Sequence, residues 1–359
     1  MTDAPLLLHV FSTFAPGGPQ VRFAAIANHF GRRWRHAVVA MDGNTACRER
    51  LDPGLDVSFL ESGAVKGDTL GNLRRFRSAL RGLRPAALVT SNWGSIEWAM
   101  ANALPLVRHV HLEDGFGPEE RDRQLPRRVW TRRVFLRRST VVVPSRVLER
   151  IATEVWRLPR GRLRYVPNGI DLGRFGAGAL AENAVPVVGT VTALRAEKNL
   201  PRLVRAFRRV VDVMPATLVL VGDGPELPML QALVAELGLG RTVRFTGHVA
   251  QPQALYAGFD VFALSSDTEQ MPLSVLEAMA ARLPVAATDV GDVRGMLAEA
   301  NGRFVVLRDD AALAEALLTL LRDPPRRRAI GADNRAKAEH DYDQATMFAA
   351  WAGLFDRSV

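Results

Sequence analysis

The sequence has few of the residues that crosslink chains or anchor them in membranes. Its 359 residues include one cysteine, Cys47, so no internal disulfide can form, as is typical of proteins from a reducing compartment. No stretch approaches the roughly 18 uncharged apolar residues of a membrane-spanning helix. The first residues lack the basic segment and long apolar run of a secretory signal. These absences predict a cytoplasmic protein, and they leave peripheral association with the inner face of the membrane open.

Lysine is scarce, although the chain is strongly basic. Three lysines are present (Lys66, Lys198 and Lys337), and the other 44 of the 47 basic residues are arginine. A coding bias toward arginine is the simplest explanation of the net charge of +9. Such a charge constrains solubility and partners rather than fold. Because no interleaved aromatic platform or docking motif accompanies it, we expect no nucleic-acid partner.

The composition is that of an ordinary globular protein, with 48% apolar and 24% charged residues. At roughly 150 residues per domain the chain is long enough for about two domains. Short apolar runs alternate with helix-like stretches in both halves, which is typical of βαβ units and parallel sheets. The strands expected in the first half are Leu6–Phe11, Ala37–Met41, Val57–Leu60, Ala86–Thr90, Leu106–Val110 and Thr140–Val143. Those expected in the second half are Val185–Val191, Thr217–Val221, Val243–Phe245, Val261–Leu264, Val285–Ala287 and Phe304–Val306.

A stretch rich in glycine and alanine, Gly173–Ala184, interrupts this alternation and is interpreted as a linker. The expected fold is therefore α/β, with two Rossmann-like, doubly wound domains that face a central cleft. We expect these domains at residues 1–172 and 185–340. Residues 341–359 are expected to form a terminal helix that crosses back to the first domain.

One segment of the second half combines several features of a binding site. It runs from Ser265 to Met279, follows the strand Val261–Leu264 and opens a helix near Pro272. Proline suits the first helical position, where its missing N–H costs nothing. The free N–H groups and positive dipole of a helix start can receive a diphosphate. Ligands also bind at the carboxyl ends of strands in open α/β sheets.

Two glutamates flank this helix start, Glu269 in the loop and Glu277 eight residues later in the helix. A carboxylate accepts two hydrogen bonds and suits vicinal hydroxyls. A pair of carboxylates around a diphosphate would match a sugar on one side and a ribose on the other. Taken alone, the pattern is equally consistent with an ordinary acidic loop followed by a glutamate on the face of a helix.

The spacing of these glutamates resembles the E-x7-E motif of glycosyltransferase family 4, whose members are retaining enzymes of the GT-B fold. Other segments resemble the family in the same order along the chain, and together they cover most of the C-terminal half. They are Tyr165–Asp171, Gly189–Leu200, Val221–Glu226, Phe245–Val249 and Leu283–Thr288. The combination is far more specific than any one of its motifs.

The resemblance implies a nucleotide-diphosphate-sugar donor and assigns roles in binding it. Glu277 is expected to bind the ribose hydroxyls, Glu269 the hydroxyls of the transferred sugar, and Lys198 the diphosphate. Val249 lies in the loop expected beside the nucleobase. The residues whose backbone is expected to line the sugar and phosphate are Gln270, Met271, Pro272 and Leu273.

A fixed cation at Lys198 would offset the charge that develops on the leaving diphosphate, so neither a metal nor another cofactor is expected. One position departs from the family pattern. Members often have an arginine five residues before this lysine, where the chain has Ala193. Arg195 either supplies the second charge or is a solvated side chain.

The first half contributes a glycine turn and a histidine. Gly17 and Gly18 follow the first strand, and adjacent glycines let backbone N–H groups approach an anion. Their place resembles the family's glycine loop, which faces the donor phosphates. His111 matches the family's active-site histidine, which implies polar contact or proton handling. His109 and the nearby acids do not suffice for a metal site, because no further ligands are evident.

The segment Arg121–Arg138 carries eight arginines interleaved with apolar residues. A basic amphipathic helix of this kind can lie on an anionic membrane surface. It can equally be a solvated helix that covers its own sheet, and the sequence leaves both interpretations open.

Together these observations predict a metal-independent, retaining glycosyltransferase of hexosyltransferase type. It would move a sugar to a glycan or lipid-linked acceptor on the N-terminal side, in surface polysaccharide synthesis. The expected catalytic residues are His111, Glu269 and Lys198. Two alternatives are a nucleotide-sugar 2-epimerase of the same fold and a catalytically silent, nucleotide-sugar-binding partner subunit.

Overall fold

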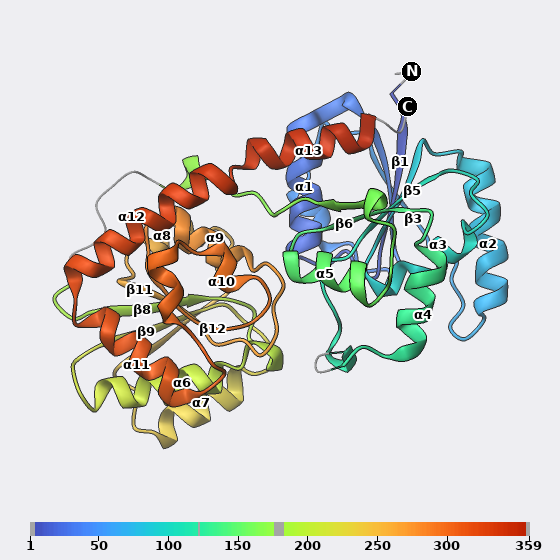
Figure 1. Ribbon diagram of the computed structural model, residues 1–359. Helices are drawn as coiled ribbons and strands as arrows, with labels where there is room; N and C mark the ends of the chain where they lie inside the picture. The colour runs from blue at the N-terminus through green and yellow to red at the C-terminus, as the bar shows by residue number, and fades with distance from the viewer. Residues whose placement is uncertain (1–3, 121–122, 176–182, 357–359) are drawn as a thin grey trace. The chain divides into compact units, whose positions relative to one another are not determined.

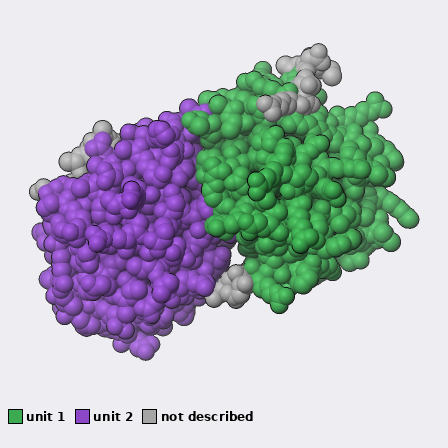
Figure 2. All heavy atoms as spheres, viewed as in Figure 1, with its two compact units in different colours: residues 1–167, 346–359 green, residues 168–345 purple. Residues whose placement is uncertain are grey.

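The computed structural model describes residues 4–120, 123–175 and 183–356. The chain divides into two compact units, coloured separately in Figure 2. Unit 1 comprises Met1–Pro167 and Thr346–Val359, and unit 2 comprises Asn168–Ala345. Each unit is described below by itself.

The units divide at Pro167, ahead of the linker expected at Gly173–Ala184. The reason is that Ile170 and Phe175 are buried in the hydrophobic core of unit 2. Residues 176–182 of the expected linker lie outside the described residues.

Unit 1 is built on a seven-stranded parallel sheet of order β3-β2-β1-β4-β5-β6-β7 (Figure 1). Its strands are β1 (Leu6–Phe11), β2 (Arg35–Ala40), β3 (Val57–Leu60), β4 (Ala87–Ser91), β5 (Arg108–Leu112), β6 (Thr140–Val143) and β7 (Leu163–Tyr165). Its helices are α1 (Gly18–Phe30), α2 (Thr69–Leu83), α3 (Ile96–Ala101), α4 (Pro126–Phe135), α5 (Arg146–Glu154) and most of α13 (Gln344–Asp356). On β1, Leu8 and Val10 share a core cluster with α2 and α3, whereas Leu7 shares one with α1 and α13. Helices therefore cover both faces of the sheet.

Unit 2 repeats this plan with a six-stranded parallel sheet of order β10-β9-β8-β11-β12-β13. Its strands are β8 (Val187–Val191), β9 (Thr217–Val221), β10 (Val243–Gly247), β11 (Val261–Leu264), β12 (Val285–Thr288) and β13 (Val305–Val306). Its helices are α6 (Leu200–Val211), α7 (Leu227–Glu236), α8 (Gln253–Tyr256), α9 (Leu273–Ala280), α10 (Val293–Met296), α11 (Asp310–Leu321) and α12 (Pro324–Asp341). Along β11, Val261 and Ala263 pack in the cluster with α6 and α11, while Phe262 and Leu264 pack in the cluster with α9. The two-residue period of a strand thus divides its side chains between two helical layers.

Both sheets reverse their strand order beside the first strand of the unit. β1 pairs with β2 on one side and β4 on the other, and β8 pairs in the same way with β9 and β11. At such a switch point the loops leave the carboxyl ends in opposite directions and open a crevice that binds ligands. The expected fold, with two Rossmann-like domains, is confirmed.

Three sequence expectations need correction. β5 spans Arg108–Leu112 rather than Leu106–Val110, because Leu106 is exposed while the last residues of the strand are buried. The edge strand β7 was not expected, since its apolar run is too short to stand out. The arginine-rich helix is limited to α4, Pro126–Phe135, and Arg121 lies outside the described residues.

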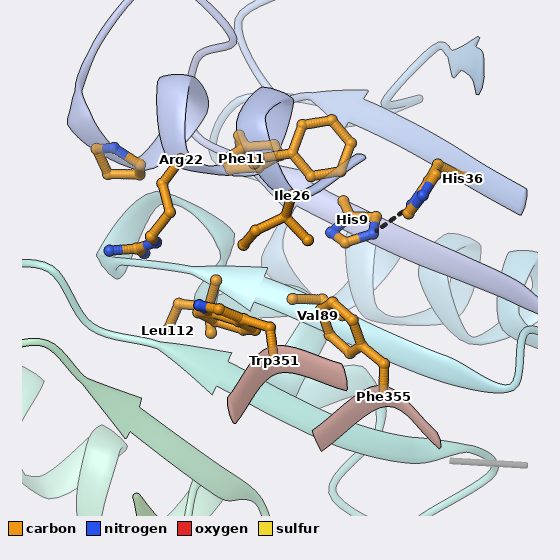
Figure 3. A pocket seen from close by; sticks show the side chains of 11 residues that line it. His9, Phe11, Arg22, Ile26, His36, Val89, Leu112, Trp351 and Phe355 are labelled. Carbon is orange, nitrogen blue, oxygen red and sulfur yellow. Dashed lines mark hydrogen bonds between the residues drawn. The ribbon is translucent and has the colours of Figure 1, made fainter. Parts of the chain in front are cut away.

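The helix α13 completes the core of unit 1. Trp351 and Phe355 are each 2% exposed and pack with residues of α1 and the sheet. Figure 3 shows both rings facing Ile26 and His9 around a small cavity. At about 10 Å³ this cavity holds at most one water molecule, so it is a packing gap and not a substrate pocket.

Candidate functional site

Unit 2 brings Lys198 and Glu269 together at the switch point of its sheet. Lys198 ends a short 3₁₀ turn between β8 and α6, and Glu269 follows β11. The Lys198 Nζ lies 2.6 Å from Glu269 Oε1, and Ser266 donates to the same oxygen over 2.7 Å. The two side chains are 22% and 10% exposed, so the ion pair remains within reach of a solute.

A buried ion pair fixes the two loops that carry these residues. The Arg202 guanidinium donates to the Ser265 carbonyl and to Asp267 Oδ1, both over 2.8 Å. The backbone N–H of Asp267 donates to the Glu197 carbonyl over 2.8 Å. Since these contacts join the loops after β8 and β11, the position of Lys198 relative to Glu269 is set by the fold.

Glu277 lies in α9 and is held by Tyr256. The Tyr256 hydroxyl donates to Glu277 Oε2 over 2.5 Å. Burial, and next the Glu277 carboxylate, raise the pKa of Tyr256 well above its ordinary value of 10. The phenol therefore keeps its proton and orients Glu277 by a charge-assisted hydrogen bond.

The backbone between the glutamates is tightly packed. Asn168 Nδ2 donates to the Met271 carbonyl over 3.1 Å, and the Asp292 N–H donates to the Gln270 carbonyl over 3.0 Å. Gly291 has a φ of 53°, and a Cβ there would lie 2.3 Å from the Glu269 carbonyl oxygen. Only glycine therefore allows this approach to the loop. The expected donor-site residues on this loop and the helix start after it are Glu269, Gln270, Met271, Pro272 and Leu273.

Two other expected residues of unit 2 lie on neighbouring loops. Val249 follows β10 and packs against the core cluster that includes α9. Arg195 is exposed, and the structure gives its side chain no hydrogen bond or ion pair with any described residue. Arg195 can therefore turn toward a ligand without breaking a contact.

In unit 1 the glycine turn lies where β1 passes into α1. Gly17 is the N-cap of α1, and Gly18 is its first residue. Gln20 donates to the Thr13 carbonyl over 2.8 Å and closes the loop. The first N–H groups of a helix are available for hydrogen bonding, so the turn is suited to receive an anion.

His111 lies at the carboxyl end of β5 and is completely buried. Its Nδ1 lies 2.8 Å from the Thr90 hydroxyl, which also lies 2.7 Å from His109 Nε2. Burial, and next the neighbouring His111, lower the pKa of His109 to about 3. His111 Nε2 has no hydrogen-bond partner among the described residues and lies 3.6 Å from Glu113 Oε2.

A buried arginine balances the acids beside His111. Arg132 of α4 is 1% exposed, donates from Nε to Glu113 over 3.0 Å, and makes two bonds of 3.1 Å to Glu120. Its guanidinium also lies about 5 Å from the ring centroids of three aromatic residues, Trp93, Phe116 and Trp156. Arg132 is therefore a core residue and takes no part in the surface of the arginine-rich helix.

The opposite face of α4 is open to solvent. Leu125, just before the helix, is 41% exposed, and Trp130 and Val134 are 59% and 44% exposed. No helix among the described residues is both long and apolar enough to cross a bilayer. In the same part of the chain, no three histidine, cysteine or acidic side chains are placed to hold a metal ion.

Several residues that shape these sites were not expected from the sequence. Tyr256, Ser266 and Arg202 support the glutamates and lysine, and Thr90 and Arg132 support the region of His111. The available signal was weak: Ser266 lies inside the recognised motif, but the contacts of the others span 19 to 65 residues of sequence.

Two family models match the chain. The model "Glycosyltransferase Family 4" matches residues 16–174, and "Glycosyl transferases group 1" matches residues 179–337. The lipopolysaccharide core biosynthesis glycosyltransferase LpsD of Rhizobium meliloti is 32% identical over 45% of this chain and 47% of that protein. The D-inositol 3-phosphate glycosyltransferase of Nocardia farcinica is 30% identical over 64% and 54%. The chain thus spans about half the length of these curated relatives.

Solved structures resemble the whole chain. The Anabaena protein Alr3699/HepE, crystallised with UDP and glucose, has a TM-score of 0.82 and 19% identity over 98% of this chain and 100% of that one. WaaG, described as a glycosyltransferase involved in lipopolysaccharide biosynthesis, has a TM-score of 0.75 and 18% identity over 97% and 99%. At these identities the likeness concerns the fold, and it confirms the expected GT-B architecture.

Proposed function

The chain belongs to glycosyltransferase family 4, and we propose that it transfers a sugar from a nucleotide-diphosphate-sugar donor to a glycan or lipid-linked acceptor. The names of its relatives, which act in lipopolysaccharide core synthesis and on inositol phosphate, support a role in surface-glycan synthesis. The UDP and glucose in the HepE crystal support a nucleotide sugar as the donor.

The observation that carries the proposal is the cluster of Lys198, Glu269 and the start of α9 at one switch point. We assign the donor diphosphate to Lys198 and the N–H groups at the start of α9, because both favour negative charge. In the absence of donor, Glu269 neutralises the lysine. When the diphosphate binds, Lys198 pairs with it instead of with Glu269. The Glu269 carboxylate can then accept hydrogen bonds from sugar hydroxyls.

The ribose is assigned to Glu277, whose orientation is set by Tyr256. As the bond between the sugar and the diphosphate breaks, Lys198 would stabilise the charge on the leaving group, which makes a metal unnecessary. We propose retention at the anomeric carbon and a polar or proton-handling role for His111, whose Nε2 has no hydrogen bond within the described part of the chain.

We further propose that the exposed face of α4 associates with an anionic membrane surface. Leu125, Trp130 and Val134 present apolar surface there, and Arg127 is exposed beside them. Apolar side chains flanked by arginine suit the boundary between headgroups and acyl chains. Flotation with anionic vesicles tests this idea, and Trp130→Ser should reduce the bound fraction.

The main test is a transfer assay on three variants, Lys198→Met, Glu269→Gln and Glu277→Gln. A thermal-shift screen with UDP-, GDP-, ADP- and dTDP-sugars first identifies the donor, since bound donor stabilises the fold by mass action. Each variant should lose about 100-fold or more in kcat/KM, whereas the exposed control Glu236→Gln should not. Full activity in all three variants would refute the assigned site, and NMR of the product anomer tests retention.

A further inference from the structure

A polar cavity of unit 1 lies at the amino ends of its strands, whereas Gly17 and His111 lie toward the carboxyl ends. It opens where β5 and β6 begin and where α4 ends. The amino ends of the strands line this cavity and their carboxyl ends carry the expected site of unit 1, with the ring centroids of His109 in the cavity wall and His111 6.2 Å apart. Its volume is about 640 Å³, which lies within the range of small-molecule sites.

Among the described residues, the cavity is lined by four arginines and by no acidic residue. The arginines are Arg108, Arg137, Arg138 and Arg162. The structure gives the side chains of the last three no hydrogen bond or ion pair with a described residue. Arg137, Arg138 and Arg162 therefore meet no carboxylate among the described residues of the cavity wall, so an anion bound there would be attracted without a competing acid.

Two other surface cavities show that this imbalance is not general in an arginine-rich chain. A cavity of about 360 Å³ in unit 1 is lined by Arg146, Arg150 and Arg160, but also by Glu149 and Glu154. In unit 2, a cavity of about 780 Å³ contains two arginines and two acids. In both, carboxylates offset the positive charge.

The inner wall of the basic cavity is rigid and polar. His109 and Ser139 line it and are 8% and 3% exposed, and Ser139 Oγ lies 2.7 Å from His109 Nδ1. The other nitrogen of His109 contacts Thr90, so the ring is fixed from both sides. Val134 and Phe135 add apolar surface at the mouth.

We propose that this cavity binds a phosphate group of an organic ligand, at a site separate from the donor site in unit 2. Arginine forks match phosphate oxygens in pairs, which explains the choice of anion. The volume and apolar lining exceed what inorganic phosphate fills, so the phosphate is attached to an organic moiety. A soluble phosphate ester and a lipid headgroup share this chemistry.

The test uses glycerol 3-phosphate in calorimetry and phosphatidic acid vesicles in flotation. The cavity variant is Arg137→Gln/Arg138→Gln/Arg162→Gln, and its matched control is Arg150→Gln/Arg160→Gln in the balanced cavity. All five arginines are exposed, so both proteins should fold, which circular dichroism verifies. We expect the cavity variant to raise the dissociation constant of at least one probe ten-fold or more, and the control to leave it unchanged.

The pattern across the probes identifies the source of the phosphate. Binding of glycerol 3-phosphate supports a soluble ester, and binding of vesicles alone supports a lipid headgroup. Binding that survives in Lys198→Met separates this site from the donor site, whatever the outcome of the transfer assay. The proposal would be overturned if the wild-type protein binds neither probe, or if the cavity variant and the control lose the same amount of probe affinity. If glycerol 3-phosphate does not bind, vesicle binding that depends on Trp130 but not on the three arginines would also overturn it.

Discussion

The two units hold their functional charges in opposite ways. In unit 2, Lys198 and Glu269 form an ion pair that solvent can still reach. In unit 1, Arg132 and Glu113 are buried with His111 and are held by further bonds and aromatic rings. An accessible pair can exchange its partner for a ligand, whereas a buried one cannot separate without a large cost. The comparison predicts that a ligand at Lys198 and Glu269 would exchange contacts in unit 2, whereas the buried charges of unit 1 would stay fixed.

The largest effect is expected from breaking the buried pair. Arg132→Met leaves the buried Glu113 without its cation and Glu120 with Arg128 alone, and should lower the free energy of unfolding of unit 1 by about 3–5 kcal/mol. Urea unfolding followed by tryptophan fluorescence measures this, because all six tryptophans lie in unit 1. Arg127→Met, on the exposed side of the same helix, is the control and should change little. Equal stability of the two variants would show that the buried network contributes nothing.

The second-largest effect is expected from acid, which should lower the stability of unit 1. Burial, only partly offset by Asp56, lowers the pKa of His36 to about 4, and burial with the charge of His36 lowers that of His9. Between pH 6.5 and 4 the unfolded state binds protons that the folded state does not, so stability falls as the pH falls through this range. His36 alone accounts for about 3 kcal/mol, which is lost by pH 4.

Urea unfolding at several pH values, again read by tryptophan fluorescence, checks this slope. His36→Leu should flatten it, whereas His29→Gln, at an exposed position, should not. A stability of unit 1 that stays constant from pH 7 to 4 would contradict the prediction.

A smaller effect is expected from the hydroxyl that orients Glu277. Tyr256→Phe removes the donor of the 2.5 Å bond and should raise the KM for the donor sugar about ten-fold, or about 1.4 kcal/mol, with a smaller change in kcat. Steady-state kinetics with the donor found in the thermal screen measure the split. Tyr165→Phe, in unit 1, serves as the control. A loss of kcat at unchanged KM would assign Tyr256 a different role.

The smallest effect on stability is expected from the accessible pair. Lys198→Met should change the free energy of unfolding by no more than about 1 kcal/mol, because the pair is partly solvated. Thermal unfolding followed by circular dichroism tests this. A loss as large as that of Arg132→Met would remove the distinction between the two units.

Sequence periodicity was sufficient for most of the fold. The strands β1, β3, β6, β9 and β11 begin and end at the expected residues, because each is a mostly apolar run with no more than one polar residue. The strand β5 was predicted too early in the chain, because it contains the polar residues Arg108, His109 and His111. Periodicity cannot distinguish such a polar strand from a loop. Loops after strands and the starts of helices could also be predicted from the sequence. The residues from Glu269 to Leu273 therefore lie on the loop and helix start where they were expected.

The supporting residues could not be found in this way. Nothing in a run of eight arginines distinguishes Arg132, which is buried only because Glu113 and Glu120 lie opposite it in the folded unit. Tyr256 reaches Glu277 from 21 residues away, across a contact that exists only once α8 and α9 have packed. Such positions are fixed by tertiary structure rather than by local pattern.

The placement of α13 makes unit 2 an insertion within unit 1. Residues 168–345 are contiguous, so this unit can be excised as one segment, whereas unit 1 is assembled from two separate stretches of chain. Stopping translation after residue 345 would leave the second unit whole but remove Trp351 and Phe355 from the first. The apolar core residues that pack against these two rings would then be exposed to water. During synthesis, the unit that begins first is therefore the last to be completed.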